Sequence, residues 1–142
     1  MNEALTWRQL AFAAPIEPDR ARGVLLGIAT MPGHPRIVLE ARAQAGRIQW
    51  RIGCSDAAMA RVRAVLRAQL PEVRLVRRKS DDDRNTLVAA ASVHVPRSRM
   101  LPLRSEPAAI DQVTRQLFDV LATTARSDQV RIQLILGVRT TP

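Results

Sequence analysis

Residues 37–52 contain the pattern that most restricts the fold of this chain: two runs of alternating side chains on either side of Ala45-Gly46. In residues 37–44 (IVLEARAQ), aliphatic residues occupy every second position. In residues 47–52 (RIQWRI), isoleucine and tryptophan alternate with arginine and glutamine. A period of two residues puts each set on its own face of a strand, and a short turn between two such runs indicates a hairpin. We therefore predict a β-hairpin with one apolar face and one face rich in arginine.

Helices and short strands are predicted on either side of this hairpin. Residues 5–13 (LTWRQLAFA) have the character of a strand, and residues 18–30 have apolar side chains on one helical face after a proline in the first turn. A second helix begins at Ser55 or Asp56 and ends before Pro71, and residues 73–79 return as a strand. The order β-α-β-β-α-β is that of a ferredoxin-like α+β sandwich, with two helices on one face of a mainly antiparallel sheet.

A second unit follows a polar break. Residues 80–86 (SDDDRNT) form a predicted linker, after which residues 87–95 are a predicted strand, residues 105–124 a helix and residues 130–138 a terminal strand. We thus divide the chain into a ferredoxin-like unit at 1–79, the linker, and a β-α-β unit at 87–142 that resembles an incomplete repeat. Such a unit cannot bury both of its faces alone, so it packs on the first unit, dimerises, or continues into further chain.

Sequence motifs of nucleotide-binding proteins are absent. The chain lacks G-x-x-x-x-G-K-[ST], and Lys79, its one lysine, has no glycine-rich loop before it. Gly23 and Gly27 lie four residues apart within a predicted helix, which favours a close helix–sheet contact over a dinucleotide fingerprint. We therefore predict that this chain binds no nucleotide cofactor.

A metal centre or a nucleophilic active site is also not indicated. Cys54 is the only cysteine, and His34 and His94, the only histidines, are distant from it in the sequence, so we interpret Cys54 as a packed thiol. The aspartate run at 81–83 lacks the spacing of a calcium loop. We predict no enzyme activity, no metal and no small-molecule substrate. An enzyme with Cys54 beside a histidine in a dimer-interface pocket is kept as a further alternative.

Positive charge is concentrated in one part of the chain. The net charge is +9, and residues 42–79 hold ten basic side chains against Asp56 and Glu72, a net of +8. Such a cluster favours an acidic partner, above all a nucleic-acid backbone. The candidate nucleic-acid-binding residues are Arg42, Arg47, Arg51, Arg61, Arg63, Arg67, Arg74, Arg77, Arg78 and Lys79. Two alternatives are arginine that is merely solvated, as GC-rich coding sequence produces, and a sheet face that covers the second unit.

Aromatic residues are too few for recognition by base stacking. The chain has two tryptophans, two phenylalanines and no tyrosine, and Trp50 is in phase with the apolar side of the hairpin. Single-stranded nucleic acids are read largely by stacking on exposed aromatic rings. We therefore expect any contact with nucleic acid to be made to the phosphate backbone.

Four segments carry a resemblance to a known family: LTWRQLAFAAPIEP (5–18), VLEARAQAGRIQWRIG (38–53), VRAVLRAQLPEVRL (62–75) and QVRIQLILGVR (129–139). Together they resemble the N-terminal region of actinobacterial conjugative-transfer ATPases, the type IV secretion coupling proteins related to FtsK and HerA DNA translocases. In that family the motor, with its Walker motifs, lies downstream of such a region. The resemblance spans about residues 5–142 and implies a non-catalytic module that acts in assembly or in docking of DNA or another substrate.

The resemblance also implies partners and a location. The partners would be DNA, other secretion-system subunits or a second copy of the chain, at the cytoplasmic side of the membrane. A single cysteine fits the reducing cytoplasm, and no run of 18 apolar residues is present. A free-standing, arginine-rich nucleic-acid-binding protein is the alternative function.

Overall fold

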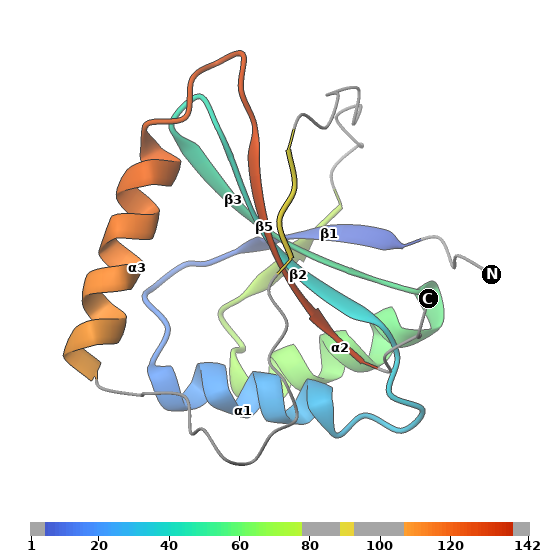
Figure 1. Cartoon of the computed structure of the whole chain (residues 1–142). Helices are drawn as coiled ribbons and strands as arrows, with labels where there is room; N and C mark the ends of the chain where they lie inside the picture. The colour runs from blue at the N-terminus through green and yellow to red at the C-terminus, as the bar shows by residue number, and fades with distance from the viewer. Residues whose placement is uncertain (1–4, 78–88, 93–106, 138–142) are drawn as a thin grey trace.

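The computed structural model describes residues 5–77, 89–92 and 107–137, and it confirms the predicted α+β class (Figure 1). The elements, in chain order, are β1 (Thr6–Ala11), α1 (Pro18–Ala29), β2 (Ile37–Gln44), β3 (Arg47–Cys54), α2 (Asp56–Gln69), β4 (Arg74–Val76), α3 (Pro107–Ala122) and β5 (Val130–Leu136). The first six follow the predicted order β-α-β-β-α-β. The linker at 80–86 lies outside the described residues. Of the strand predicted at 87–95 only residues 89–92 are described, and they form neither helix nor strand.

The five strands of the described residues belong to one antiparallel sheet in the order β4-β1-β3-β2-β5. The terminal strand β5 pairs with β2 over its whole length, from Ile37 opposite Leu136 to Ala43 opposite Val130. The second unit therefore extends the sheet of the first. Strand β5 lies at one edge of the sheet and exposes apolar side chains, including Leu134 and Ile135.

Helices α1 and α2 lie beneath the sheet in Figure 1 and form the main core with it. Ile37 and Ile52 of the hairpin are fully buried against Ile28 of α1 and Val62 of α2. Helix α2 begins where the sequence predicts, because the Ser55 side chain accepts a hydrogen bond from a backbone N–H of the first turn.

The two glycines of α1 make a different contact from the one predicted. A Cβ atom at Gly23 would lie 2.6 Å from the Gln69 side chain, and one at Gly27 would lie 2.7 Å from Val65. Both neighbours belong to α2, so the glycines allow close packing of two helices and not of a helix on the sheet. The prediction of a helix–sheet contact is wrong. The spacing of the two glycines indicates that another element packs closely on the helix, but it does not indicate which element.

Helix α3 covers the same sheet face at the hairpin end. Phe118 meets the Trp50 ring edge-on, with ring centroids 6.1 Å apart, and Leu121 is 1% exposed. Trp50 is two residues from Ile52 in β3, so both side chains lie on the helix-covered face, as their phase predicts. In the described ranges, no helix combines the length and apolar character needed to cross a membrane.

Candidate anion-binding site

The sheet face opposite the helices, which we call the polar face, carries rows of charged and amide side chains. Strand register places Gln9, Arg51, Glu40 and Gln133 in one row across four strands. Two residues further along β2, Arg42 lies between Gln49 and Arg131. Arg42, Arg47 and Arg51 therefore share one face, as the alternation in the sequence predicts. Arg74 of β4 lies on the same face at the far edge of the sheet.

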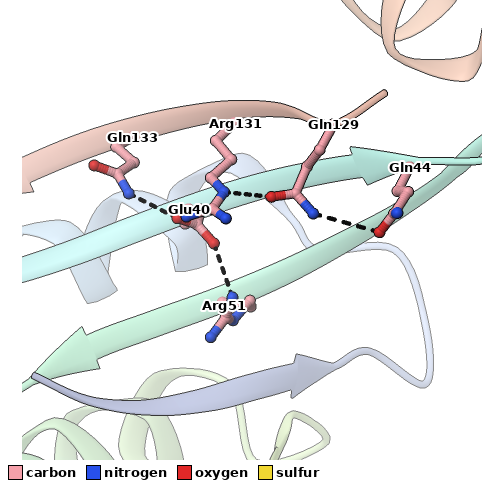
Figure 2. Close-up of polar contacts among 6 residues, drawn as sticks. All are labelled: Glu40, Gln44, Arg51, Gln129, Arg131 and Gln133. Carbon is pink, nitrogen blue, oxygen red and sulfur yellow. Dashed lines mark hydrogen bonds and ion pairs between the residues drawn. The ribbon is translucent and has the colours of Figure 1, made fainter. Parts of the chain in front are cut away.

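Arg51, one of the candidate residues, makes an ion pair and a ring contact within the protein. Its Nη1 atom lies 3.3 Å from the Oε1 atom of Glu40, which is only 1% exposed (Figure 2). The Nε2 atom of Gln133 donates to the other carboxylate oxygen at 2.7 Å. The Arg51 guanidinium also stacks over Trp7, 4.8 Å from the ring centroid. The Trp7 ring lies so close to Gly53 that a Cβ there would be 2.9 Å from three ring atoms. The charge of Arg51 is thus offset inside the protein.

The neighbouring part of the polar face is hollowed, with a cavity volume of about 340 Å³ at the hairpin turn. Its lining residues, which we call the arginine hollow, are Arg42, Gln44, Ala45, Arg47, Gln49 and Arg126. Arg42 is 9% exposed, whereas Arg47 and Arg126 are exposed. Among the residues that the structure describes, no acidic side chain lines this hollow. It therefore gathers three guanidinium groups at one end of the sheet.

A chain of polar contacts reaches Gln44, one of the residues that line the arginine hollow. The Nε atom of Arg131 donates to Gln129 at 2.6 Å, and the Gln129 amide donates to the side-chain oxygen of Gln44 at 3.3 Å (Figure 2). Arg131 also lies directly opposite Arg42 in the β2–β5 register. Both arginines have interaction partners within the protein.

Arg126 reaches the arginine hollow from a distant part of the sequence. It lies between α3 and β5, and the two residues before it accept backbone hydrogen bonds from the hairpin turn. The N–H of Ala45 donates to the Ala125 carbonyl at 3.3 Å, and that of Gly46 donates to the Thr124 carbonyl at 3.1 Å. No local pattern around Arg126 indicates this contact, which is why sequence reasoning missed it.

The other candidate arginines lie elsewhere. Arg61, Arg63 and Arg67 are exposed on α2, which covers the opposite side of the sheet, and Arg61 donates to the Pro32 carbonyl at 3.0 Å. Arg77 is exposed after β4, and Arg78 and Lys79 lie outside the described residues. Of the eight candidates that the structure describes, Arg42 and Arg47 line the arginine hollow.

The candidates for catalysis do not form a site in the described residues. Cys54 is fully buried in the core, as its interpretation as a packed thiol predicts. His34 lies in the turn after α1 with a φ of 41°, while His94 and the aspartates at 81–83 fall outside the described residues. Within the described part of the chain, no group of His, Cys, Asp and Glu side chains is placed to hold a metal ion.

The arginine hollow has the chemistry of a phosphate site. Guanidinium groups bind phosphate oxygens through paired N–H donors, and three arginines line this cavity. Comparisons with protein-family models, curated proteins and solved structures find no match to this chain. The resemblance to conjugative-transfer ATPases stays a prediction.

Proposed function

We propose that this chain is a non-catalytic docking module that binds the phosphate backbone of DNA through the arginine hollow. The observation that supports this function best is the convergence of Arg42, Arg47 and Arg126 on one cavity without an acidic lining residue among those described. A phosphodiester carries negative charge, and its oxygens can accept hydrogen bonds from guanidinium groups such as these.

Contact with the backbone is favoured over contact with bases. No aromatic side chain lines the arginine hollow among the described residues. On the polar face, Trp7 is covered by Arg51, and Trp50 lies on the other face against Phe118. Because base-specific binding of single strands depends on exposed rings, we expect affinity that changes little with base sequence.

The charge of the whole chain and the family resemblance support DNA as the source of the phosphates. A net charge of +9, most of it within residues 42–79, attracts a polyanion over a longer range than it attracts a single phosphate. The resemblance to conjugative-transfer ATPases would place this docking in DNA transfer by a type IV secretion system. A free-standing nucleic-acid-binding protein is the alternative, and coding sequence that continues into a G-x-x-x-x-G-K-[ST] motif would favour the first.

Fluorescence anisotropy with labelled single-stranded and duplex DNA tests the proposal. The affinity should fall steeply as salt rises, because phosphate contacts release counterions. The double variant Arg47→Glu with Arg126→Glu should lose at least about tenfold in affinity, as expected for the loss of two charged contacts. The matched control is Arg22→Glu with Arg115→Glu, which changes the net charge equally at exposed positions of α1 and α3.

Two results would refute DNA docking at this site. One is the absence of binding to either form of DNA at low salt. The other is an equal loss of affinity in the control, which would mean that only the total charge matters. A third double variant, Arg63→Glu with Arg67→Glu, tests the exposed arginines of α2, and a larger loss there would move the binding surface to that helix.

Assembly is a second candidate function, favoured by apolar side chains exposed on α3 and β5. Val113 and Val120 of α3 are each 63% exposed, and Ile135 of β5 is 55% exposed. Exposed apolar groups beside an edge strand are typical of surfaces that contact another chain. Light scattering after size-exclusion chromatography should then show a mass that rises with concentration and falls to the monomer value in Ile135→Lys. A wild-type monomer at every concentration would exclude self-association.

A further inference from the structure

We infer that the arginine hollow is an inter-unit phosphate site, formed only when the α3–β5 segment is docked on the hairpin, and that Gly46 is the positioning residue for Arg126. This inference rests on the proposed function and goes further, because it identifies what assembles the site. Arg42 and Arg47 come from the hairpin, and Arg126 comes from the second unit. Neither unit alone supplies the set of three.

The conformation of the hairpin turn holds the backbone just before Arg126. Ala45 and Gly46 both have positive φ angles, 52° and 69°, as the central residues of the tight hairpin turn that matches strand twist. Both of their N–H groups donate to the segment that leads into Arg126, one to Thr124 and one to Ala125. The backbone immediately before Arg126 is therefore held by two hydrogen bonds to residues that lie next to Arg47.

Gly46 lies close to the C-terminal end of helix α3. A Cβ atom there would lie 3.0 Å from the backbone oxygen of Ala122, the last residue of α3. A backbone oxygen cannot turn away as a flexible side chain can, so a side chain at position 46 should displace the end of α3 by a few tenths of an ångström. The shift would be transmitted through residues 123–125 to Arg126, while Arg42 and Arg47 remain on their strands.

Binding and docking of the two units are consequently linked. A phosphate held by all three arginines binds the docked arrangement more tightly than any arrangement in which Arg126 has moved away. DNA should therefore strengthen the contact between α3 and the hairpin. Loosening that contact should weaken DNA binding even when every arginine is present.

The test is a double-mutant cycle between Gly46→Asn and Arg126→Ala in the full chain, read by anisotropy of labelled single-stranded DNA. Asparagine tolerates a positive φ, so this change adds a Cβ with little backbone strain. The matched control is Gly33→Asn, because Gly33 has a φ of 79° and a Cβ there meets nothing within 4 Å. Circular dichroism confirms that each variant is folded.

Gly46→Asn should weaken binding roughly tenfold, about the value of one charge-assisted contact, and Gly33→Asn should bind as the wild type does. In the Arg126→Ala background, Gly46→Asn should have little further effect, since the group that it displaces is already gone. Both single variants should also reduce the slope of log affinity against log salt by about 0.7, the value for one phosphate contact with a single strand.

Wild-type affinity in Gly46→Asn, or an equal loss with and without Arg126, would overturn the positioning role of Gly46 and leave the proposed function intact. Failure of the wild type to bind DNA at low salt would instead overturn the proposed function and the phosphate site with it. If Gly46→Asn does not fold, Phe118→Leu loosens the contact of α3 with Trp50 without touching the hairpin turn. The same loss, dependent on Arg126, is then expected, and a loss independent of Arg126 would contradict the inference.

Discussion

Replacing Glu40 by leucine should destabilise this protein strongly. The Glu40 side chain is 1% exposed and accepts two hydrogen bonds, from Arg51 at 3.3 Å and from Gln133 at 2.7 Å. Leucine removes the negative charge and leaves the guanidinium of Arg51, whose side chain is 15% exposed, without its counter-charge. The Gln133 amide loses its acceptor at the same time.

The size of the effect follows from how well Arg51 can be solvated afterwards. Removing one partner of a fully buried ion pair costs about 3–5 kcal/mol. Arg51 retains some contact with water and its stacking on Trp7, so the expected loss here is smaller, about 2–3 kcal/mol. A domain of this size is stable by only about 5–15 kcal/mol, so such a loss is a large fraction of the total.

Urea unfolding followed by circular dichroism measures this change as a lower midpoint with an unchanged slope. The double variant Glu40→Leu with Arg51→Leu should be more stable than Glu40→Leu alone, because it removes the uncompensated charge as well. A loss below about 0.5 kcal/mol for Glu40→Leu, which is typical of surface positions, would refute a structural role for the pair. So would strictly additive effects of the two substitutions.

Two further predictions concern other contacts of the first unit. Gly53→Ala should lower the free energy of unfolding by about 1–3 kcal/mol, because the new methyl group meets the Trp7 ring. Trp7→Leu should relieve part of that cost, and an unfolding curve of Gly53→Ala like that of the wild type would contradict the prediction. The pKa of Glu72 lies below its ordinary value of 4.5, chiefly through a hydrogen bond from its own backbone and further through Arg20. Because a lowered pKa in the folded state stabilises the fold above the unfolded-state pKa, the wild type should be more stable than Glu72→Gln at neutral pH. That difference should vanish as the pH falls below 4.5 in an acid titration, and its persistence at strongly acidic pH would contradict the assignment.

The local structure of the first unit could be predicted from the sequence. The hairpin, the helix faces, the Ser55 cap and the side on which Trp50 lies depend on residues within one or two turns of each other. Period-two alternation alone places Arg42, Arg47 and Arg51 on one face. These features are encoded locally, so that a single sequence determines them.

Only the tertiary structure decided which of those arginines share a site. Arg51 belongs to a buried pair with Glu40, and Arg126 joins Arg42 and Arg47 because β5 pairs with β2 and the hairpin turn holds the loop before it. These contacts join residues that are distant in the sequence, and no local pattern selects one long-range partner over another. Packing and backbone hydrogen bonding in the assembled fold select the long-range partners of each residue. Buried polar groups require hydrogen-bond partners, and strands pair where the folded chain brings them together.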